Sequence, residues 1–239
     1  MIQRRRILQS IGGMAAAVAA PNVLADARTK IVIGQSAAMS GPAAQLGIQF
    51  AAGAKLMFER VNASGGVNGK TLELKTLDDG YEPERCAGNT RKLIDEDVFA
   101  LFGYIGTPTS VAALPLATNA KIPFVAPFTG AQVLRDPFNR YAFHVRASYF
   151  DETARIVNQL YAVGMKNIAV FYQNDAYGQA GLAGVQRALA AVNSKPVALG
   201  TVERNTVDVA AAVKAIVPAK PEGIVQISAY KSCAAFIRE

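Results

Sequence analysis

The chain has 239 residues, with 25 Lys plus Arg against 18 Asp plus Glu, a formal net charge of +7 and 51% hydrophobic residues. This mixture excludes a disordered chain, and the length allows one or two globular domains. Two cysteines are too few for a disulfide scaffold or a cysteine-rich metal site, and a single histidine excludes a metal-binding helix with two histidines. A Ser/His or Cys/His catalytic pair would depend on His144 alone, which argues against hydrolase chemistry.

The first 27 residues have the pattern of a secretory signal peptide. Arginines at positions 4–6 precede a short apolar stretch over residues 11–20, and the Ala-Asp-Ala sequence at 25–27 is a typical cleavage site. The apolar stretch is shorter than the about 20 residues that a membrane-spanning helix needs. We therefore expect cleavage near Ala27 and a periplasmic protein; the alternatives are an amphipathic first helix or a membrane anchor. The arginines also resemble a twin-arginine signal with imperfect flanks, so the twin-arginine and general export routes both stay open.

Removal of this segment takes away three arginines and one aspartate, which leaves 22 basic and 17 acidic residues and a net charge of +5. These charges are scattered along the chain, as is typical of a solvated surface. The sequence has no basic patch interleaved with aromatic residues, so we expect no nucleic-acid partner.

From residue 30 the chain alternates short apolar strands with amphipathic helices. In a first block, strands are predicted at 30–33, 71–77, 98–102, 122–126 and 141–145, and helices at 43–62, 82–97 and 108–119. In a second block, helices at 150–163, 177–192 and 207–216 alternate with strands at 167–172, 197–202 and 223–227, and a further helix begins near Lys231.

This alternation predicts an α/β fold with two Rossmann-like lobes, each built on a parallel sheet that helices cover on both faces. We place the first lobe at residues 28–147 and the second at 148–239. The second has only three clear strands, which is few for such a lobe, so we expect it to be truncated.

Ligands of open parallel sheets bind beyond the carboxyl ends of the strands, so the loops at those ends hold the candidate site residues. The first such loop, residues 103–110, includes Tyr104 and Gly106 and opens a helix, with Thr107 predicted as the N-cap and Pro108 as the first helical residue. Backbone N–H groups at this position would bind a carboxylate or a phosphate. Plain helix capping without a ligand is the alternative.

The second loop contains Phe128, Thr129 and Gly130 and follows the next strand, so its hydroxyl and backbone groups are expected to face the same crevice. Phe128 is either a wall for an apolar ligand or a core residue. In the second block, Tyr177 and Tyr230 each follow a predicted strand, where a tyrosine either closes over a ligand or lies on the surface.

Several catalytic patterns are missing from the sequence. It has no phosphate-binding P-loop, no GxSxG nucleophile elbow and no GxGxxG after a strand with an acidic residue about 20 positions on, so no cofactor is expected. Asp78 and Asp79 suggest a metal or acid–base chemistry, but adjacent carboxylates in an extended segment point to opposite sides, which favours surface or capping roles. For His144 we also expect a structural role, and we expect neither catalytic nor metal-binding residues.

Taken together, several motifs resemble the leucine/isoleucine/valine-binding protein family, the type I periplasmic solute-binding proteins of ABC transporters. They are MSGP at 39–42, NASGGVNGK at 62–70, DD at 78–79, the loop at 103–110 and NDAYG at 174–178. The resemblance runs from about residue 30 to the end of the sequence. The ordered combination is specific, whereas no single motif would be.

The resemblance implies two lobes that are joined by a hinge and close over a small ligand. It implies that Thr107 holds the ligand carboxylate, that main-chain groups of residues 128–130 assist, and that Tyr177 and Tyr230 approach from the second lobe. The resulting set of ligand-binding residues is Tyr104, Gly106, Thr107, Phe128, Thr129, Gly130, Tyr177 and Tyr230.

The sequence also departs from the family pattern. Leu46 stands where an aromatic residue often flanks the ligand, and the positions of the family's disulfide fall near Tyr81 and Gly106. Cys86 and Cys233 lie in different blocks, so we expect no bridge between them. By the same resemblance, the acidic residue that binds the ligand ammonium would lie beyond the last residue, which leaves specificity for amino acids open.

The resemblance implies an exported solute-binding protein that captures an amino acid or a similar small carboxylate for a membrane permease of an ABC transporter. The alternative is an extracellular ligand-sensing receptor domain of the same fold. An exported enzyme is a third option, which the absence of any recognisable nucleophile–base pair argues against.

Overall fold

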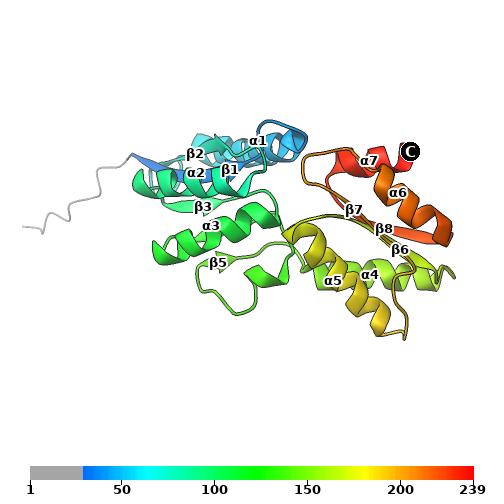
Figure 1. The fold of residues 1–239 in the computed structure, drawn as a ribbon. Coiled ribbons are helices and arrows are strands. Elements are labelled where there is room, and N and C mark those ends of the chain that lie inside the picture. The colour runs from blue at the N-terminus through cyan, green and yellow to red at the C-terminus, as the bar shows by residue number, and fades with distance from the viewer. Residues whose placement is uncertain (1–28) are drawn as a thin grey trace, which may run out of the picture.

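The computed structural model describes residues 29–239, so the expected signal peptide lies outside the described part of the chain. Two parallel sheets form the framework, with strand orders β2-β1-β3-β4-β5 and β7-β6-β8 (Figure 1). The strands are β1 (Lys30–Ala37), β2 (Thr71–Asp78), β3 (Ala100–Phe102), β4 (Phe124–Val125), β5 (Ala142–Phe143), β6 (Ile168–Gln173), β7 (Leu199–Val202) and β8 (Gly223–Ile227). The predicted α/β fold with two parallel-sheet lobes is confirmed.

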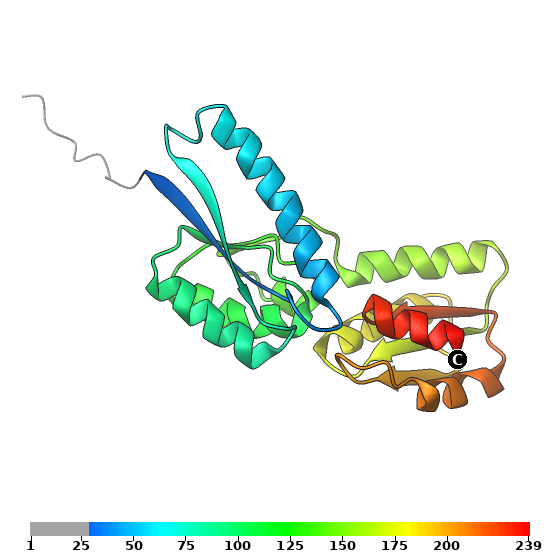
Figure 2. The same ribbon diagram turned by 90° about the horizontal axis from the view of Figure 1, so that it is seen from above.

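The helices follow the strands in the predicted order. They are α1 (Ala44–Ala63), α2 (Pro83–Asp95), α3 (Thr107–Asn119), α4 (Tyr149–Ala162), α5 (Ala176–Ala190), α6 (Ala210–Ile216) and α7 (Tyr230–Arg238), with short 3-10 helices at Gln132–Leu134 and Val217–Ala219. We call residues 29–143 the N-terminal lobe, 144–148 the crossover segment and 149–239 the C-terminal lobe. Figure 2 shows the two lobes side by side.

Strand β1 is longer than predicted, because a loop was expected from Gly34 onward. The strand instead continues to Ala37, which pairs with Asp78 of β2. Its polar residues are buried because they find partners inside the lobe: the Gln35 amide donates to the Gly103 carbonyl at 3.0 Å, and the Ser36 hydroxyl donates to the Asp79 carboxylate at 2.7 Å. Polar residues can be buried when their side chains are hydrogen-bonded in this way, and an apolar sequence pattern does not identify such a stretch as a strand.

Helices cover both faces of the N-terminal sheet. Successive side chains of a strand point to opposite sides, so neighbouring residues contact different helices. Leu101 of β3 packs with residues of α2 and α3 in one buried cluster that includes Leu93 and Ala113. Its neighbour Phe102 meets the rings of Phe50 and Phe58 of α1 on the opposite face.

The C-terminal lobe repeats this arrangement around β6, which is buried along its whole length. Ile168 and Val170 pack with α4 and α5, whereas Ala169 and Phe171 pack with α6 and α7. Figure 1 accordingly shows α4 and α5 on one side of this sheet and α6 and α7 on the other. A central strand with no polar face therefore anchors the lobe.

The crossover segment is held firmly against the N-terminal lobe. The Arg135 guanidinium donates to the carbonyls of Arg146 and Ala147, at 2.8 and 3.2 Å. Helix α4 then begins with a capping box, in which the hydroxyl of Ser148 accepts from the backbone N–H of Asp151 at 3.1 Å. The first helix of the C-terminal lobe thus starts from a segment that is hydrogen-bonded to the N-terminal lobe.

Neither Asp78 nor Asp79 caps a helix, because the N-caps of α1 and α2 are Ala43 and Glu82 and neither helix start has a side-chain cap; both carboxylates instead accept from N–H groups of loops. The Asp78 carboxylate accepts from the backbone N–H groups of Met39, Ser40 and Gly80 at 2.8–3.2 Å, and so ties the loop before α1 to the end of β2. Asp79 is fully buried and accepts from the Tyr81 N–H at 2.8 Å.

His144 likewise has a structural contact, since its Nε2 lies 3.0 Å from the carbonyl oxygen of Leu134. Within residues 29–239, no helix combines the length and the hydrophobicity needed to cross a bilayer.

Replacement of Phe171 by alanine tests the two-sided burial of β6. The Phe171 ring is fully buried and stacks on Phe236 at a centroid distance of 4.3 Å. We expect Phe171→Ala to lower the free energy of unfolding by about 3–5 kcal/mol, measured by urea denaturation. As the control, Phe138→Ala removes a ring that is 86% exposed and should change the free energy by no more than about 0.5 kcal/mol.

The carboxylate of Asp78 gives a pH dependence of stability. Partial burial opposes its ionisation, but the Ser40 hydroxyl, the N–H groups of Met39 and Gly80 and the Arg85 guanidinium outweigh that effect and lower the pKa to about 2. Because the folded-state pKa lies below the unfolded value, this stabilisation is complete above about pH 4 and is lost as the pH falls toward 2. In Asp78→Asn we expect a lower free energy of unfolding at neutral pH and a shallower decline between pH 4 and 2, measured by urea denaturation across that range.

Candidate functional site

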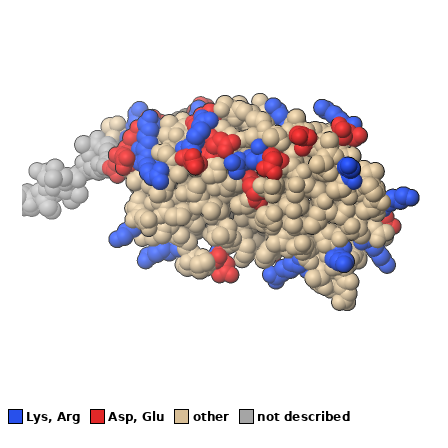
Figure 3. Space-filling view, in the orientation of Figure 1, with Lys and Arg blue, Asp and Glu red and all other residues tan. Residues whose placement is uncertain are grey.

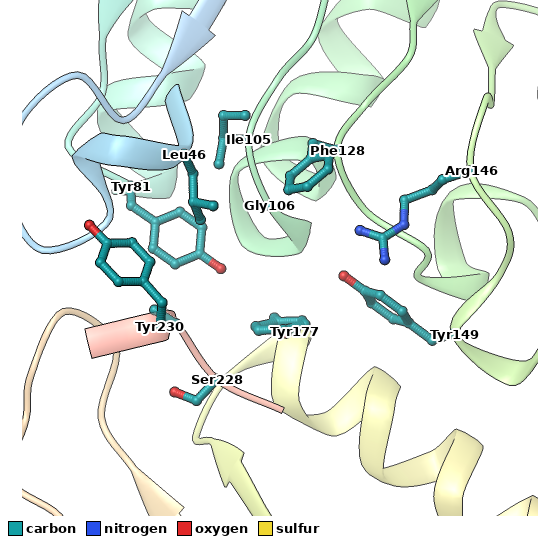
Figure 4. A pocket seen from close by; sticks show the side chains of 11 residues that line it. Leu46, Tyr81, Ile105, Gly106, Phe128, Arg146, Tyr149, Tyr177, Ser228 and Tyr230 are labelled. Atoms are coloured by element: carbon teal, nitrogen blue, oxygen red, sulfur yellow. The ribbon is translucent and has the colours of Figure 1, made fainter. Parts of the chain in front are cut away.

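A pocket of about 310 Å³ lies between the two lobes, where the carboxyl ends of both sheets meet (Figure 4). The N-terminal lobe contributes Leu46, Tyr81, Ile105, Gly106 and Phe128; the crossover segment and the start of α4 contribute Arg146 and Tyr149; the C-terminal lobe contributes Tyr177, Ser228, Ala229 and Tyr230. Every lining residue except Leu46 and Tyr149 belongs to the crossover or to a loop or helix start that directly follows a strand. The topology of two parallel sheets therefore creates this pocket.

Two strand-end loops of the N-terminal lobe are joined by backbone hydrogen bonds to form one wall. The Phe128 N–H donates to the Tyr104 carbonyl at 2.7 Å, and the Gly106 N–H donates to the Phe128 carbonyl at 3.3 Å. These bonds extend the pairing of β3 with β4 past the strand ends. Gly106 and Phe128 are thereby presented side by side to the pocket.

The start of α3 differs from the prediction. Helix α3 begins at Thr107, the N-cap is Gly106, and Pro108 is the second helical residue, so Thr107 is not the cap. Gly106 has φ +91°, and a Cβ at this position would collide with the Tyr81 ring, which explains why glycine is required here. The Thr107 hydroxyl instead shares a hydrogen bond of 2.6 Å with the hydroxyl of Thr129, and both side chains are fully buried.

Tyr81 closes this wall from the β2–α2 loop. It is 5% exposed and adopts φ +66°, a left-handed conformation that is unusual for a bulky residue. Its ring lies over Gly106, and the family resemblance puts a disulfide near these two residues. Burial and the nearby Asp175 carboxylate raise the pKa of the Tyr81 hydroxyl, so it stays neutral and is available for hydrogen bonding.

The opposite wall comes from the start of α5. The Asp175 carboxylate caps this helix by accepting from the N–H groups of Tyr177 and Gly178, at 2.9 and 3.4 Å. The cap sets the direction of Tyr177, whose ring lies 5.6 Å from that of Tyr149. Burial raises the pKa of the Tyr177 hydroxyl, so this wall too carries an uncharged phenol. Figure 4 shows Tyr177 and Tyr149 facing the loop of Gly106 across the pocket.

Arg146 is the one charged residue among those that line the pocket. Its guanidinium forms a two-pronged ion pair with the Glu152 carboxylate at 2.6–2.9 Å. It also lies over the rings of Phe128 and Tyr149, at 5.1 and 5.4 Å from their centroids. This cation is thus oriented by a carboxylate behind it and by aromatic rings on either side.

Four of the eight residues predicted to bind a ligand line this pocket: Gly106, Phe128, Tyr177 and Tyr230. The other four, Tyr104, Thr107, Thr129 and Gly130, are buried behind it. The Tyr104 ring belongs to the core of the N-terminal lobe, and its hydroxyl lies 3.1 Å from that of Thr90. These four residues support the wall and are not themselves lining residues.

Sequence reasoning missed Arg146 and Tyr149 as lining residues, and also Tyr81, Ile105, Ser228 and Ala229. The first two had a usable signal, because they flank the boundary between the two predicted blocks, and a segment that joins two lobes must pass the cleft between them. Ser228 directly follows the predicted strand at 223–227. The rule that ligands bind beyond the carboxyl ends of strands, which identified Tyr230, therefore applied to Ser228 as well.

The pocket combines aromatic walls, the start of a helix and a single oriented cation. This chemistry suits a small molecule with an anionic group and an apolar body. Within residues 29–239, no group of three or more His, Cys, Asp or Glu side chains is arranged to hold a metal ion.

The sequence profile of the periplasmic binding protein family matches residues 30–239. The chain belongs to this family. This periplasmic binding protein is 31% identical, over 66% of its own length and 42% of the relative's, to a Pseudomonas aeruginosa protein named amino acid binding protein. It is 26% identical, over 90% of its length and 56% of the relative's, to a Brucella abortus protein named Leu/Ile/Val-binding protein homolog 7.

A solved structure is similar to this chain in both fold and sequence. The crystal structure of a possible leucine/isoleucine/valine-binding protein from Rhodopirellula baltica matches with a TM-score of 0.84 and 38% identity, over 89% of this chain and 59% of that one. The resemblance to the leucine/isoleucine/valine-binding protein family is therefore confirmed. The chain spans about half the length of the curated relatives named above.

Replacement of Gly106 by alanine tests the wall of the pocket. The new methyl group would collide with Tyr81, and the positive φ would be strained, so we expect a loss of about 3 kcal/mol in the free energy of unfolding, measured by urea denaturation. Gly53→Ala is the matched control, because Gly53 lies in α1 with open space around it. This second change should stabilise the helix by up to about 1 kcal/mol.

Proposed function

We propose that this periplasmic binding protein is the solute-binding component of an ABC transporter, which captures an amino acid or a similar small carboxylate and delivers it to a membrane permease. The observation that carries the proposal is that both lobes line a single pocket. A ligand held by both walls binds the closed arrangement more tightly than an open one, and therefore shifts the protein toward closure. The closed form is the shape that a permease would recognise.

The ligand's anionic group is proposed to lie near Gly106, where the N-terminal turn of α3 offers backbone N–H groups and a partial positive charge. Arg146 adds a full positive charge on the neighbouring wall. Of the predicted residues 128–130 only Phe128 lines the pocket, and its N–H and carbonyl bond to Tyr104 and Gly106, so this loop holds the wall of the proposed anion site in place. Thr107 contributes by holding Thr129 in place behind it.

The apolar part of the ligand is proposed to pack against Tyr177, Tyr230 and Phe128. Leu46, which lines the pocket beside them, leaves room where an aromatic residue is often found in the family. Branched-chain amino acids and aromatic carboxylates both fit this description. The names of the relatives favour the former, and the number of aromatic rings around the pocket favours the latter.

Membership of this family implies an extracytoplasmic location. We further propose that residues 1–27 direct export and are removed near Ala27, so that the mature protein acts in the periplasm. Binding without chemical turnover is part of the proposal, because none of the lining residues forms a nucleophile–base pair.

Isothermal titration calorimetry with L-leucine, L-valine and benzoate tests the proposed function. For whichever of these binds, we expect Tyr177→Ala to weaken the affinity tenfold or more, since the variant loses the ring that forms one wall. Tyr141→Ala is the matched control, because Tyr141 lies outside the residues that line the pocket, and its affinity should equal that of the wild type.

Two results would contradict the proposal. One is an affinity of Tyr177→Ala equal to that of wild type for every bound probe. The other is chemical conversion of a bound probe by the purified protein, followed by mass spectrometry.

A further inference from the structure

Beside the pocket, the two lobes are joined by a second set of contacts that no ligand-binding role explains. The N-terminal lobe contributes one short segment, residues 80–82 between β2 and α2. The C-terminal lobe contributes the ends of β6 and β7, through Gln173, Asp175, Arg204 and Asn205. In Figure 3, acidic and basic side chains meet on the face that spans both lobes.

These contacts form a closed ring of hydrogen bonds. The Gln173 amide donates to the Tyr81 hydroxyl at 3.4 Å and to the Asp175 carboxylate at 2.6 Å. Arg204 then donates to Asp175 at 3.4 Å and to Glu82 at 2.8 Å. Because Tyr81 and Glu82 are neighbours in the chain, the ring leaves the N-terminal lobe at one residue and returns to it at the next.

Asn205 reinforces this ring. Its side-chain amide donates to the Gly80 carbonyl at 3.1 Å and to the Glu82 carboxylate at 2.7 Å. Glu82 thus receives two donors from the opposite lobe, one of which is charged. An isolated exposed ion pair contributes little, but several charge-assisted hydrogen bonds that share groups contribute more together.

We propose that residues 80–82 together with Gln173, Asp175, Arg204 and Asn205 form an interlobe clasp that stabilises the closed arrangement and couples it to the pocket. The proposal rests on the proposed function in one respect, namely that the lobes separate to admit a ligand. It adds that closure has its own interactions, which exist whether or not a ligand is bound.

Two members of the clasp connect it to the pocket. Tyr81 both lines the pocket and accepts from Gln173, so its ring faces the ligand space while its hydroxyl contacts the other lobe. The Asp175 carboxylate both accepts a hydrogen bond from Arg204 and caps the helix that carries Tyr177. Anything that displaces either tyrosine must therefore disturb the clasp.

The backbone of Tyr81 supports this assignment. A tyrosine at φ +66° is held in a strained conformation, and such strain persists only where the surroundings fix it, as is common at functional sites. On one side, the Asp79 carboxylate accepts from the Tyr81 N–H, and on the other the ring packs on Gly106. The segment is thus held in place in the N-terminal lobe before it meets the C-terminal lobe.

The test is the distance between the lobes in the intact, ligand-free protein, measured by double electron–electron resonance. Spin labels are attached to Arg91→Cys on α2 and Lys214→Cys on α6, both exposed, in a Cys233→Ser background; Cys86 is fully buried and escapes labelling. We expect Arg204→Ala to reduce the ratio of short to long distances about fivefold, and Glu82→Gln and 1 M NaCl to reduce it in the same direction.

Lys75→Ala is the matched control, because it removes an ion pair of similar exposure, Lys75–Glu96 at 2.6 Å, that lies within the N-terminal lobe. Its distance distribution should equal that of the wild type. Thermal unfolding of each variant verifies that it is folded. We expect folded variants, because Arg204 and Glu82 are both partly exposed. Tyr81→Phe keeps the ring but removes the hydroxyl, and should cause a smaller change in the same direction.

A distance distribution that is the same in wild type, Arg204→Ala and Glu82→Gln would overturn the clasp, even if the calorimetric probes bind. Conversely, a shift in these variants without binding of any probe would support the clasp and leave only the proposed ligands wrong. The failure of one proposal is thereby distinguishable from the failure of the other.

Discussion

The structure depends on one constraint of parallel sheets: all strands of a sheet end at the same edge. When two such sheets are joined by a short crossover with their carboxyl edges facing each other, the loops that follow the strands meet between them. Tyr81, Gly106 and Phe128 on one side and Tyr177 and Tyr230 on the other are brought together in this way. These residues are separated by long stretches of sequence, and only the common edge makes them neighbours.

Sequence patterns were sufficient to predict the elements because each pattern reflects burial. The alternation of strands and helices predicted parallel sheets covered on both faces, and alternate residues of β6 do enter two separate cores. The extension of β1 was not predictable from such patterns, because Gln35 and Ser36 are polar and buried only by virtue of partners that lie far away in the sequence. Apolar periodicity identifies cores, but it does not identify satisfied polar groups.

The candidate site was predictable in part for a similar reason. Loops after strands could be recognised, and Gly106, Phe128, Tyr177 and Tyr230 do line the pocket. Which residue of a loop faces the pocket depends on close packing between loops: the Tyr81 ring leaves no space for a side chain at position 106, so glycine becomes the cap and Thr107 turns inward to Thr129. The orientation of Arg146 depends in the same way on Glu152 and on two aromatic rings, none of which a local motif reveals.

The contact between Tyr81 and Gly106 affects the redox conditions under which the N-terminal lobe can reach its native state. Near the positions where the family resemblance puts a covalent sulfur link, the cleft rim is held by a ring packed on backbone, and the two cysteines of the described chain, Cys86 in α2 and Cys233 in α7, are free thiols. The rim therefore contains no bond whose formation needs an oxidant. Its geometry is therefore the same under reducing and oxidising conditions, and no thiol chemistry has to precede the folding of the N-terminal lobe.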